Sequence, residues 1–205
     1  VLSQFSIKKK IIVVGGHTGS GKTELLNELK KAGEQVIDLE GLANHRGSAF
    51  GKLGLPPQPS NEYFENMLGC ILRNTNENKS VWVEAESHSI GQVKIPDDFF
   101  NQLQKAPLVE INCSVAYRKE RILKEYSIFP KKDLAECTNK ISKRLGNLRL
   151  NEALTALESD DFNSWVDILI DYYDRTYSHS LSERKSLQRF SMDVADNEKM
   201  SDLVN

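Results

Sequence analysis

Cysteine is scarce in this sequence, and long apolar runs are missing. Cys70, Cys113 and Cys137 are odd in number and have no C-x-x-C spacing, so neither a disulfide framework nor a zinc site is indicated. No apolar run approaches the roughly 18 residues of a membrane span, and residues 1–10 have no apolar middle like that of a secretion signal. We therefore expect a cytoplasmic protein with reduced thiols and no membrane partner.

The stretch G-H-T-G-S-G-K-T at residues 16–23 restricts the function most. It follows the apolar run at residues 11–14 and precedes leucines at helical spacing. Glycines here let backbone N–H groups surround an anion, and the helix that follows adds its positive N-terminal end. The spacing predicts a phosphate-binding P-loop, in which Lys22 supplies a cation and Thr23 a Mg²⁺ ligand. The predicted phosphate-binding residues are Gly16, His17, Thr18, Gly19, Ser20, Gly21, Lys22 and Thr23.

Two acids follow the apolar run at residues 81–83. In a P-loop fold, the end of such a strand lies beside the bound phosphates, where an acid can hold Mg²⁺ through water or accept a proton. We predict that Glu84 joins Thr23 in holding Mg²⁺ and that Glu86 lies nearby. A surface glutamate that ends a strand is the alternative.

The alternation of apolar runs and helical patterns predicts an α/β fold of the P-loop NTPase type, with three layers, a parallel sheet and a helical C-terminal part. Strands are expected at 11–14, 35–39, 81–83, 108–111 and, at one edge, 187–192, with a long loop at 40–60. We expect one domain over 1–205, with a core at about 11–115, a helical segment at about 116–178 and a C-terminal tail at 179–205.

Positive charge is concentrated between residues 117 and 149. This segment has ten Lys and Arg against four acids, although the whole chain has a net charge of −2. Such segregation favours contact with a polyanion, while ordinary solvated helices are the alternative. The candidate residues for this contact are Arg118, Arg121, Lys140, Lys143 and Arg144.

Several stretches together resemble one family. They are the P-loop, I-D-L-E-G-L-A-N-H-R-G-S at 37–48, V-W-V-E-A-E-S at 81–87, K-R-L-G at 143–146, and Y-Y-D at 172–174 with Tyr177. From about residue 11 to residue 178 the chain resembles the P-loop half of tRNA 2-selenouridine synthase. Many members of that family have Asp, Arg and Pro where this chain has Ala85, His88 and Arg175.

The resemblance implies a transferase that modifies 2-thiouridine at the wobble position of tRNA. Members of the family transfer a geranyl group from geranyl diphosphate to the sulfur and then exchange it for selenium from selenophosphate. They also carry a rhodanese-like domain, which is not found in this sequence. We therefore expect selenation to need a rhodanese-like partner, whether the chain is a natural subunit or an excised domain.

The resulting hypothesis assigns catalytic roles to five residues. The P-loop binds the diphosphate, whose growing negative charge is stabilised by fixed amides, by Lys22 and by Mg²⁺. His45 and Arg46 approach the same site or the nucleotide, and Glu84 and Glu86 organise metal and water.

Two other functions stay open. A small-molecule or nucleotide kinase would bind ATP or GTP at the P-loop and close a lid containing Arg118, Arg121 and Arg144. A non-catalytic RNA-docking subunit would use the loop only to sense a nucleotide.

Overall fold

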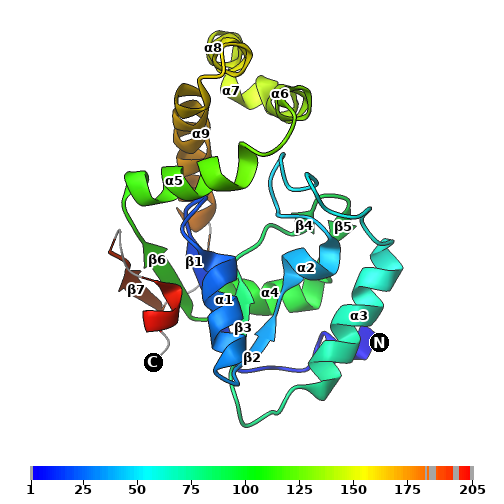
Figure 1. Ribbon diagram of the computed structural model, residues 1–205. Coiled ribbons are helices and arrows are strands. Elements are labelled where there is room, and N and C mark those ends of the chain that lie inside the picture. Colours follow the sequence, from blue (N-terminus) through cyan, green and yellow to red (C-terminus); the bar gives the residue numbers. More distant parts are fainter. Residues whose placement is uncertain (1, 183, 185–187, 196–198, 204–205) are drawn as a thin grey trace.

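A five-stranded parallel sheet lies at the centre of the protein (Figure 1). The computed structural model describes residues 2–182, 184, 188–195 and 199–203. The sheet has the order β2-β3-β1-β6-β7, and each neighbouring pair is parallel. Because β1 is the central strand, the P-loop leaves from the middle of the sheet. The strands are β1 (Ile11–Gly16), β2 (Gln35–Ile37), β3 (Val81–Glu84), β6 (Leu108–Asn112) and β7 (Arg189–Asp193).

Helices cover both faces of the sheet, which gives the predicted three layers. Successive residues of a strand point to opposite faces, so Val13 and Val14 belong to different clusters of the core. On the Val14 side pack α1 (Lys22–Lys31) and the 3₁₀ helix η2 (Met200–Leu203). On the Val13 side pack α3 (Asn61–Asn74), α4 (Asp97–Lys105) and the 3₁₀ helix η1 (Leu2–Gln4). In Figure 1, α1 lies in front of the sheet and α4 behind it.

Residues 115–182 form a group of helices that we call the helical cap. It has its own apolar cluster around the buried Trp165, whose indole N–H donates to Thr138 Oγ1 at 3.1 Å. Figure 1 shows α6 to α8 farthest from the sheet, with α9 running back toward it. The cap consists of α5 (Val115–Tyr126), α6 (Lys131–Lys140), α7 (Ser142–Leu145), α8 (Asn147–Glu158) and α9 (Phe162–Ser182).

The predicted strand at 35–39 is too long, because the chain turns into a helix at Asp38. The Asp38 side chain accepts a hydrogen bond from the N–H of Gly41 at 2.7 Å, which caps α2 (Leu39–Ala43). The predicted loop at 40–60 therefore begins with a helical turn, and this turn carries Glu40.

Two further features were not predicted. Downstream of β3 lies a short hairpin of β4 (Ser89–Ile90) and β5 (Val93–Lys94), with Gly91 at φ 60° in its turn. The segment at 131–158 is also divided into separate helices, since α6 ends at Lys140 and α7 ends at Leu145, before Gly146 with φ 85°. Leu148, at the start of α8, is 74% exposed.

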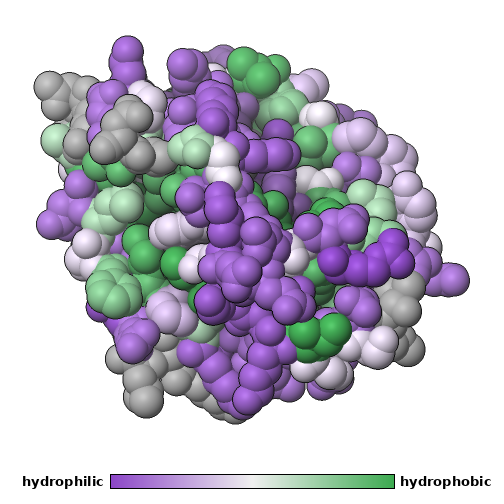
Figure 2. All heavy atoms as spheres, turned by 90° about the horizontal axis from the view of Figure 1, so that it is seen from below, coloured by the Kyte–Doolittle hydropathy of each residue, from purple (hydrophilic) through white to green (hydrophobic). Residues whose placement is uncertain are grey.

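The C-terminal prediction is close to the structure. The predicted edge strand at 187–192 is β7, parallel to β6, and η2 follows it; residue 187 lies outside the described residues. Figure 2 views the molecule from the side opposite the helical cap, where hydrophobic groups lie on either side of a hydrophilic band. The P-loop lies at the other end of the sheet, facing the cap (Figure 1).

Candidate functional site

The P-loop joins the end of β1 to the start of α1, as predicted. Gly19 and Gly21 have φ of 82° and 91°, a conformation that residues with a Cβ avoid. A Cβ on Gly19 would also lie 2.9 Å from the carbonyl oxygen of Arg118. Gly21 is the N-cap of α1 and gives no side-chain hydrogen bond to it. The N–H groups of the first turn are therefore open to an anion.

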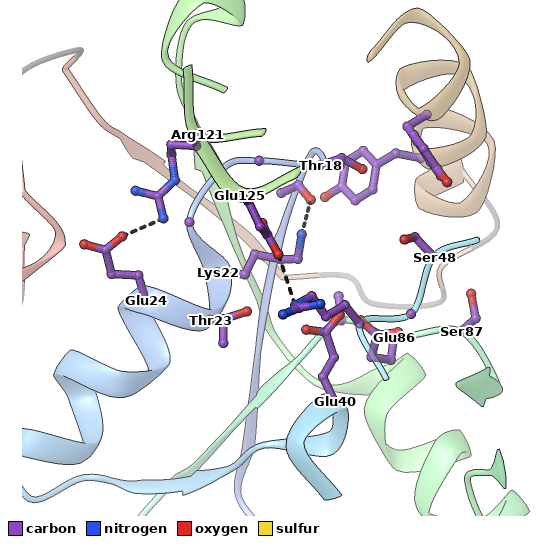
Figure 3. Close-up of a pocket in the computed structure, with 18 of the residues that line it drawn as sticks. Thr18, Lys22, Thr23, Glu24, Glu40, Ser48, Glu86, Ser87, Arg121 and Glu125 are labelled. Carbon is purple, nitrogen blue, oxygen red and sulfur yellow. Dashed lines mark hydrogen bonds and ion pairs between the residues drawn. The ribbon is translucent and has the colours of Figure 1, made fainter. Parts of the chain in front are cut away.

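A cavity of about 760 Å³ adjoins the P-loop. Lys22 and Thr23 line it, and the Lys22 ammonium donates to the Gly16 carbonyl at 2.9 Å (Figure 3). His17 and Ser20 are not part of its wall. The side of the cavity that faces the helical cap is partly apolar, and its apolar and aromatic wall residues include Leu55, Tyr126, Tyr173 and Tyr177.

Three glutamates meet beside Lys22. Glu40 comes from α2, Glu84 ends β3, and Glu86 follows two residues later; a ligand oxygen of each lies within 4.8 Å of the others. Glu40 and Glu86 line the cavity (Figure 3), whereas Glu84 lies behind its wall with 0% exposure. Burial raises the pKa of all three carboxyls, and the negative charge of a neighbouring glutamate raises each further.

This cluster fits a hard divalent cation. All of its donors are carboxylate oxygens, which Mg²⁺ prefers. One oxygen of Glu84 accepts the Glu40 N–H at 2.8 Å, and the other is buried without a hydrogen-bond partner in the described part of the chain. A buried, unpartnered carboxylate oxygen is costly unless something binds it.

Two arginines border the cavity and are held by acids. Arg46 Nε lies 3.0 Å from Glu125 Oε1, and a nitrogen of Arg121 lies 2.5 Å from Glu24 Oε2. Figure 3 shows the pair of Arg121 and Glu24 at one side of the site. An anionic ligand can displace these carboxylates and bind the guanidinium groups in their place.

The back of the P-loop is fixed by the helical cap. Arg118 of α5 makes two hydrogen bonds to Asp174 of α9, at 2.7 and 2.8 Å, and Asp174 also reaches His17 Nδ1 at 3.0 Å. The His17 ring contacts Tyr177, whose hydroxyl donates to Glu110 at 3.1 Å. Burial alone would raise the pKa of Asp174, but the hydrogen bonds and charge of Arg118 hold it below its ordinary value.

Comparison with known proteins agrees with this geometry. Residues 9–203 match the family described as tRNA 2-selenouridine synthase AAA domain. The chain belongs to this family. It is 32% identical to the tRNA 2-selenouridine synthase of Nitrosomonas europaea, covering 90% of this chain and 60% of that protein. It is 34% identical to the corresponding Pseudomonas fluorescens protein, covering 88% and 56%.

The tRNA 2-selenouridine synthase relatives are thus longer than this chain, which spans less than two thirds of their length. Among solved structures, the full-length tRNA isopentenylpyrophosphate transferase of Bacillus halodurans matches with a TM-score of 0.49 and 12% identity, covering 97% of this chain and 95% of that one. Within the described residues, no helix is long and apolar enough to cross a membrane.

Two residues of the predicted site, His45 and Arg118, do not lie where the sequence analysis placed them. His45 does not line the cavity; its ring packs against Gly51, and burial lowers its pKa. Arg118 is only 4% exposed and is occupied by Asp174, so it is not on an exposed RNA-binding face. A helical pattern cannot reveal this, because the partner lies 56 residues farther along the chain.

The basic segment contains an exposed group and a group paired with acids. Lys140, Lys143 and Arg144 are exposed on α6 and α7. Five others form ion pairs with acids, and most of these acids lie on or beside α9. The pairs reduce the charge asymmetry seen in the sequence. The paired residues of the basic segment are Arg118, Lys119, Arg121, Lys131 and Arg149.

No sequence pattern gave a role to Glu40, Glu125 or Asp174. Glu40 lies just beyond β2, and Glu84 ends β3; this shared place near the end of a strand was the available signal. Asp174 lies in the Y-Y-D stretch shared with the family, and the structure gives this stretch a role in holding the P-loop.

Proposed function

We propose that this chain is the P-loop part of a tRNA 2-selenouridine synthase and transfers a geranyl group to the sulfur of wobble 2-thiouridine. The observation that carries the proposal is the P-loop beside a cavity with both charged and apolar walls. A diphosphate would lie on the loop and the open N-terminus of α1, with its hydrocarbon chain against Leu55, Tyr126 and Tyr173. The names of the relatives support the tRNA substrate.

The reaction is a substitution at C1 of the geranyl group. The thiouridine sulfur forms a bond to C1 while the bond from C1 to oxygen breaks, and the diphosphate leaves with the electron pair. The N3 proton of the base passes to water. Because negative charge grows on the leaving diphosphate, fixed positive groups accelerate the reaction most.

Four of the five predicted catalytic residues have a place in this proposal; His45, which does not line the cavity, has none. Lys22 leaves the Gly16 carbonyl for the diphosphate, and the P-loop amides hold its oxygens. Thr23 and Glu84 would hold Mg²⁺, which when bound adds positive charge near the leaving group. Glu86 orients water and metal ligands from the cavity wall, and Arg46 approaches the nucleotide.

The tRNA would be held by its phosphates on the exposed side of the cap. Lys140, Lys143 and Arg144 are exposed there, and Arg121 borders the cavity. Such contacts attract RNA without reading its sequence. Replacement of the geranyl group by selenium would need a rhodanese-like domain or partner in addition to these residues. We expect the proposed tRNA-modifying chain to act in the cytoplasm.

The proposal is tested by measuring geranyl transfer directly. The chain is incubated with a 2-thiouridine anticodon stem-loop and geranyl diphosphate, with and without a rhodanese-like protein and selenophosphate. The masses of the resulting nucleosides are then measured by mass spectrometry. The proposal predicts a geranylated nucleoside with the chain alone and a selenated one only with the partner. ATP consumption with a small acceptor would instead show a kinase, and ligand binding without turnover a docking subunit.

A further inference from the structure

Glu40, Glu84 and Glu86 form a compact acidic cluster that no positive side chain neutralises. Among the described residues, none of the three forms an ion pair within 4.0 Å. The two nearest candidates are engaged elsewhere, since Lys22 donates to the Gly16 carbonyl and Arg46 pairs with Glu125. In the described part of the chain, no cationic side chain is therefore paired with the cluster.

A second observation points to a ligand. Glu84 is 0% exposed, and one of its carboxylate oxygens has no hydrogen-bond partner in the described structure. The other oxygen is fixed by the Glu40 N–H at 2.8 Å, which also fixes the backbone that carries Glu40. The unpartnered oxygen thus belongs to a fixed carboxylate of the cluster and is shielded from water.

We propose that Glu40, Glu84 and Glu86 together bind one divalent cation, Mg²⁺ or Mn²⁺, before any phosphate ligand enters. The P-loop motif by itself indicates a metal at Thr23 that arrives with the phosphates. In our proposal this is the same ion, and the three glutamates bind it before Thr23 and the phosphates join them. Oxygens on opposite sides of Mg²⁺ are about 4.2 Å apart. Adjacent oxygens are about 3 Å apart, and only one pair of the three can lie on opposite sides, so the ligand oxygens, within 4.8 Å of one another, move closer together when the ion binds.

The position of this cation gives it a function. Lys22 and Thr23 line the same cavity as Glu40 and Glu86, and Figure 3 shows all four side chains around one space. A cation here converts an acidic surface, which repels a diphosphate, into one that attracts it. The phosphate ligand then meets a site in which the metal is already placed.

Direct binding to the whole chain tests the proposal without any enzymatic activity. Mn²⁺ is titrated into the metal-free protein, with no phosphate present, and free Mn²⁺ is followed by its EPR signal; Mg²⁺ is titrated by calorimetry. We expect one site in the unaltered chain and at least tenfold weaker binding in Glu40→Gln and in Glu86→Gln. Glu24→Gln is the matched control, because Glu24 lines the same cavity but is paired with Arg121. Its affinity should equal that of the unaltered chain.

Thermal unfolding separates loss of the site from loss of the fold. Removing one of three mutually repelling carboxylates should raise the melting temperature of the metal-free protein, while the stabilisation by Mn²⁺ should largely disappear. Equal Mn²⁺ affinity in both variants and the unaltered chain, or binding that appears only after pyrophosphate is added, would overturn the proposal. Cation binding without any geranyl transfer would leave it standing and would count against the proposed reaction alone.

Discussion

Arg118 of α5 and Asp174 of α9 form an ion pair with two hydrogen bonds directly behind the P-loop. Arg118 is almost fully buried, and Asp174 extends the contact to His17 within the loop. The helical cap thus fixes the loop from behind while its front faces the cavity. The shape of the phosphate site therefore depends on a residue more than 150 positions away in the sequence.

Replacing Asp174 should destabilise the protein and weaken phosphate binding together. Asp174→Asn leaves the buried Arg118 charge unpaired, at a cost of about 3 kcal/mol in the free energy of unfolding. Asp167→Asn is the control, since it removes a more exposed pair between the same two helices and should cost less than about 1 kcal/mol. Urea unfolding and pyrophosphate titration measure the two effects. Equal losses in both variants would contradict this account of the buried pair.

The glycines of the P-loop should matter for the ligand beyond their effect on stability. Gly19→Ala strains a left-handed residue and brings the new methyl group against the Arg118 carbonyl, so pyrophosphate affinity should fall at least tenfold. Gly33→Ala has a similar φ of 86° but open space around it. It should cost about 1–2 kcal/mol of stability and leave pyrophosphate affinity unchanged. If both variants bind pyrophosphate equally well, the loop geometry is not what sets the affinity.

Stability should depend on pH through the glutamate cluster. Burial and mutual repulsion raise the pKa of Glu40 to about 8, above the unfolded value. The folded state therefore binds protons more tightly, and its stability is lost as pH rises toward 8. In metal-free buffer the free energy of unfolding should fall between pH 5 and pH 8 (about the span from the unfolded to the raised pKa). Glu40→Gln should reduce this fall, and Glu24→Gln should not. A flat pH profile for the unaltered chain would refute the prediction.

The exposed basic residues of α6 and α7 should bind RNA through phosphates. Charge reversal at Lys140 and Arg144 should weaken binding of the anticodon stem-loop and reduce the slope of log affinity against log salt by roughly 1.4 to 1.8, as expected for two lost phosphate contacts. Lys105→Glu, at the end of α4, should leave the slope unchanged. Fluorescence anisotropy at several salt concentrations measures the slopes. An unaltered slope in the double variant would rule out these residues as RNA contacts.

Much of the fold could be predicted because local signals agree with the tertiary structure. The apolar run before the glycines became the central strand, and Ser60 caps α3 as its sequence position indicates. Glu84 ends β3 beside the P-loop because it pairs in register with Val14. These features depend on strand burial, glycine conformation and capping, all of which act over a few residues.

The parts that could not be predicted depend on long-range contacts. Arg118 has the pattern of a solvated helix residue, and only the fold brings it to Asp174. Glu40 joins the acidic cluster because Asp38 caps a helical turn where an extended strand was expected. His45 is directed away from the cavity although its neighbour Arg46 lines it. Packing between distant segments determines these positions. The spacing of apolar residues along the sequence does not reveal that packing.

The most direct test of the central claim compares geranyl transfer by two lysine variants of α1. Lys22→Ala removes the cation that meets the diphosphate, whereas Lys30→Ala changes an exposed lysine of the same helix. The account predicts that Lys22→Ala forms geranylated nucleoside about 100-fold more slowly or worse, while Lys30→Ala keeps the rate of the unaltered chain. Full geranylation by Lys22→Ala would contradict the account.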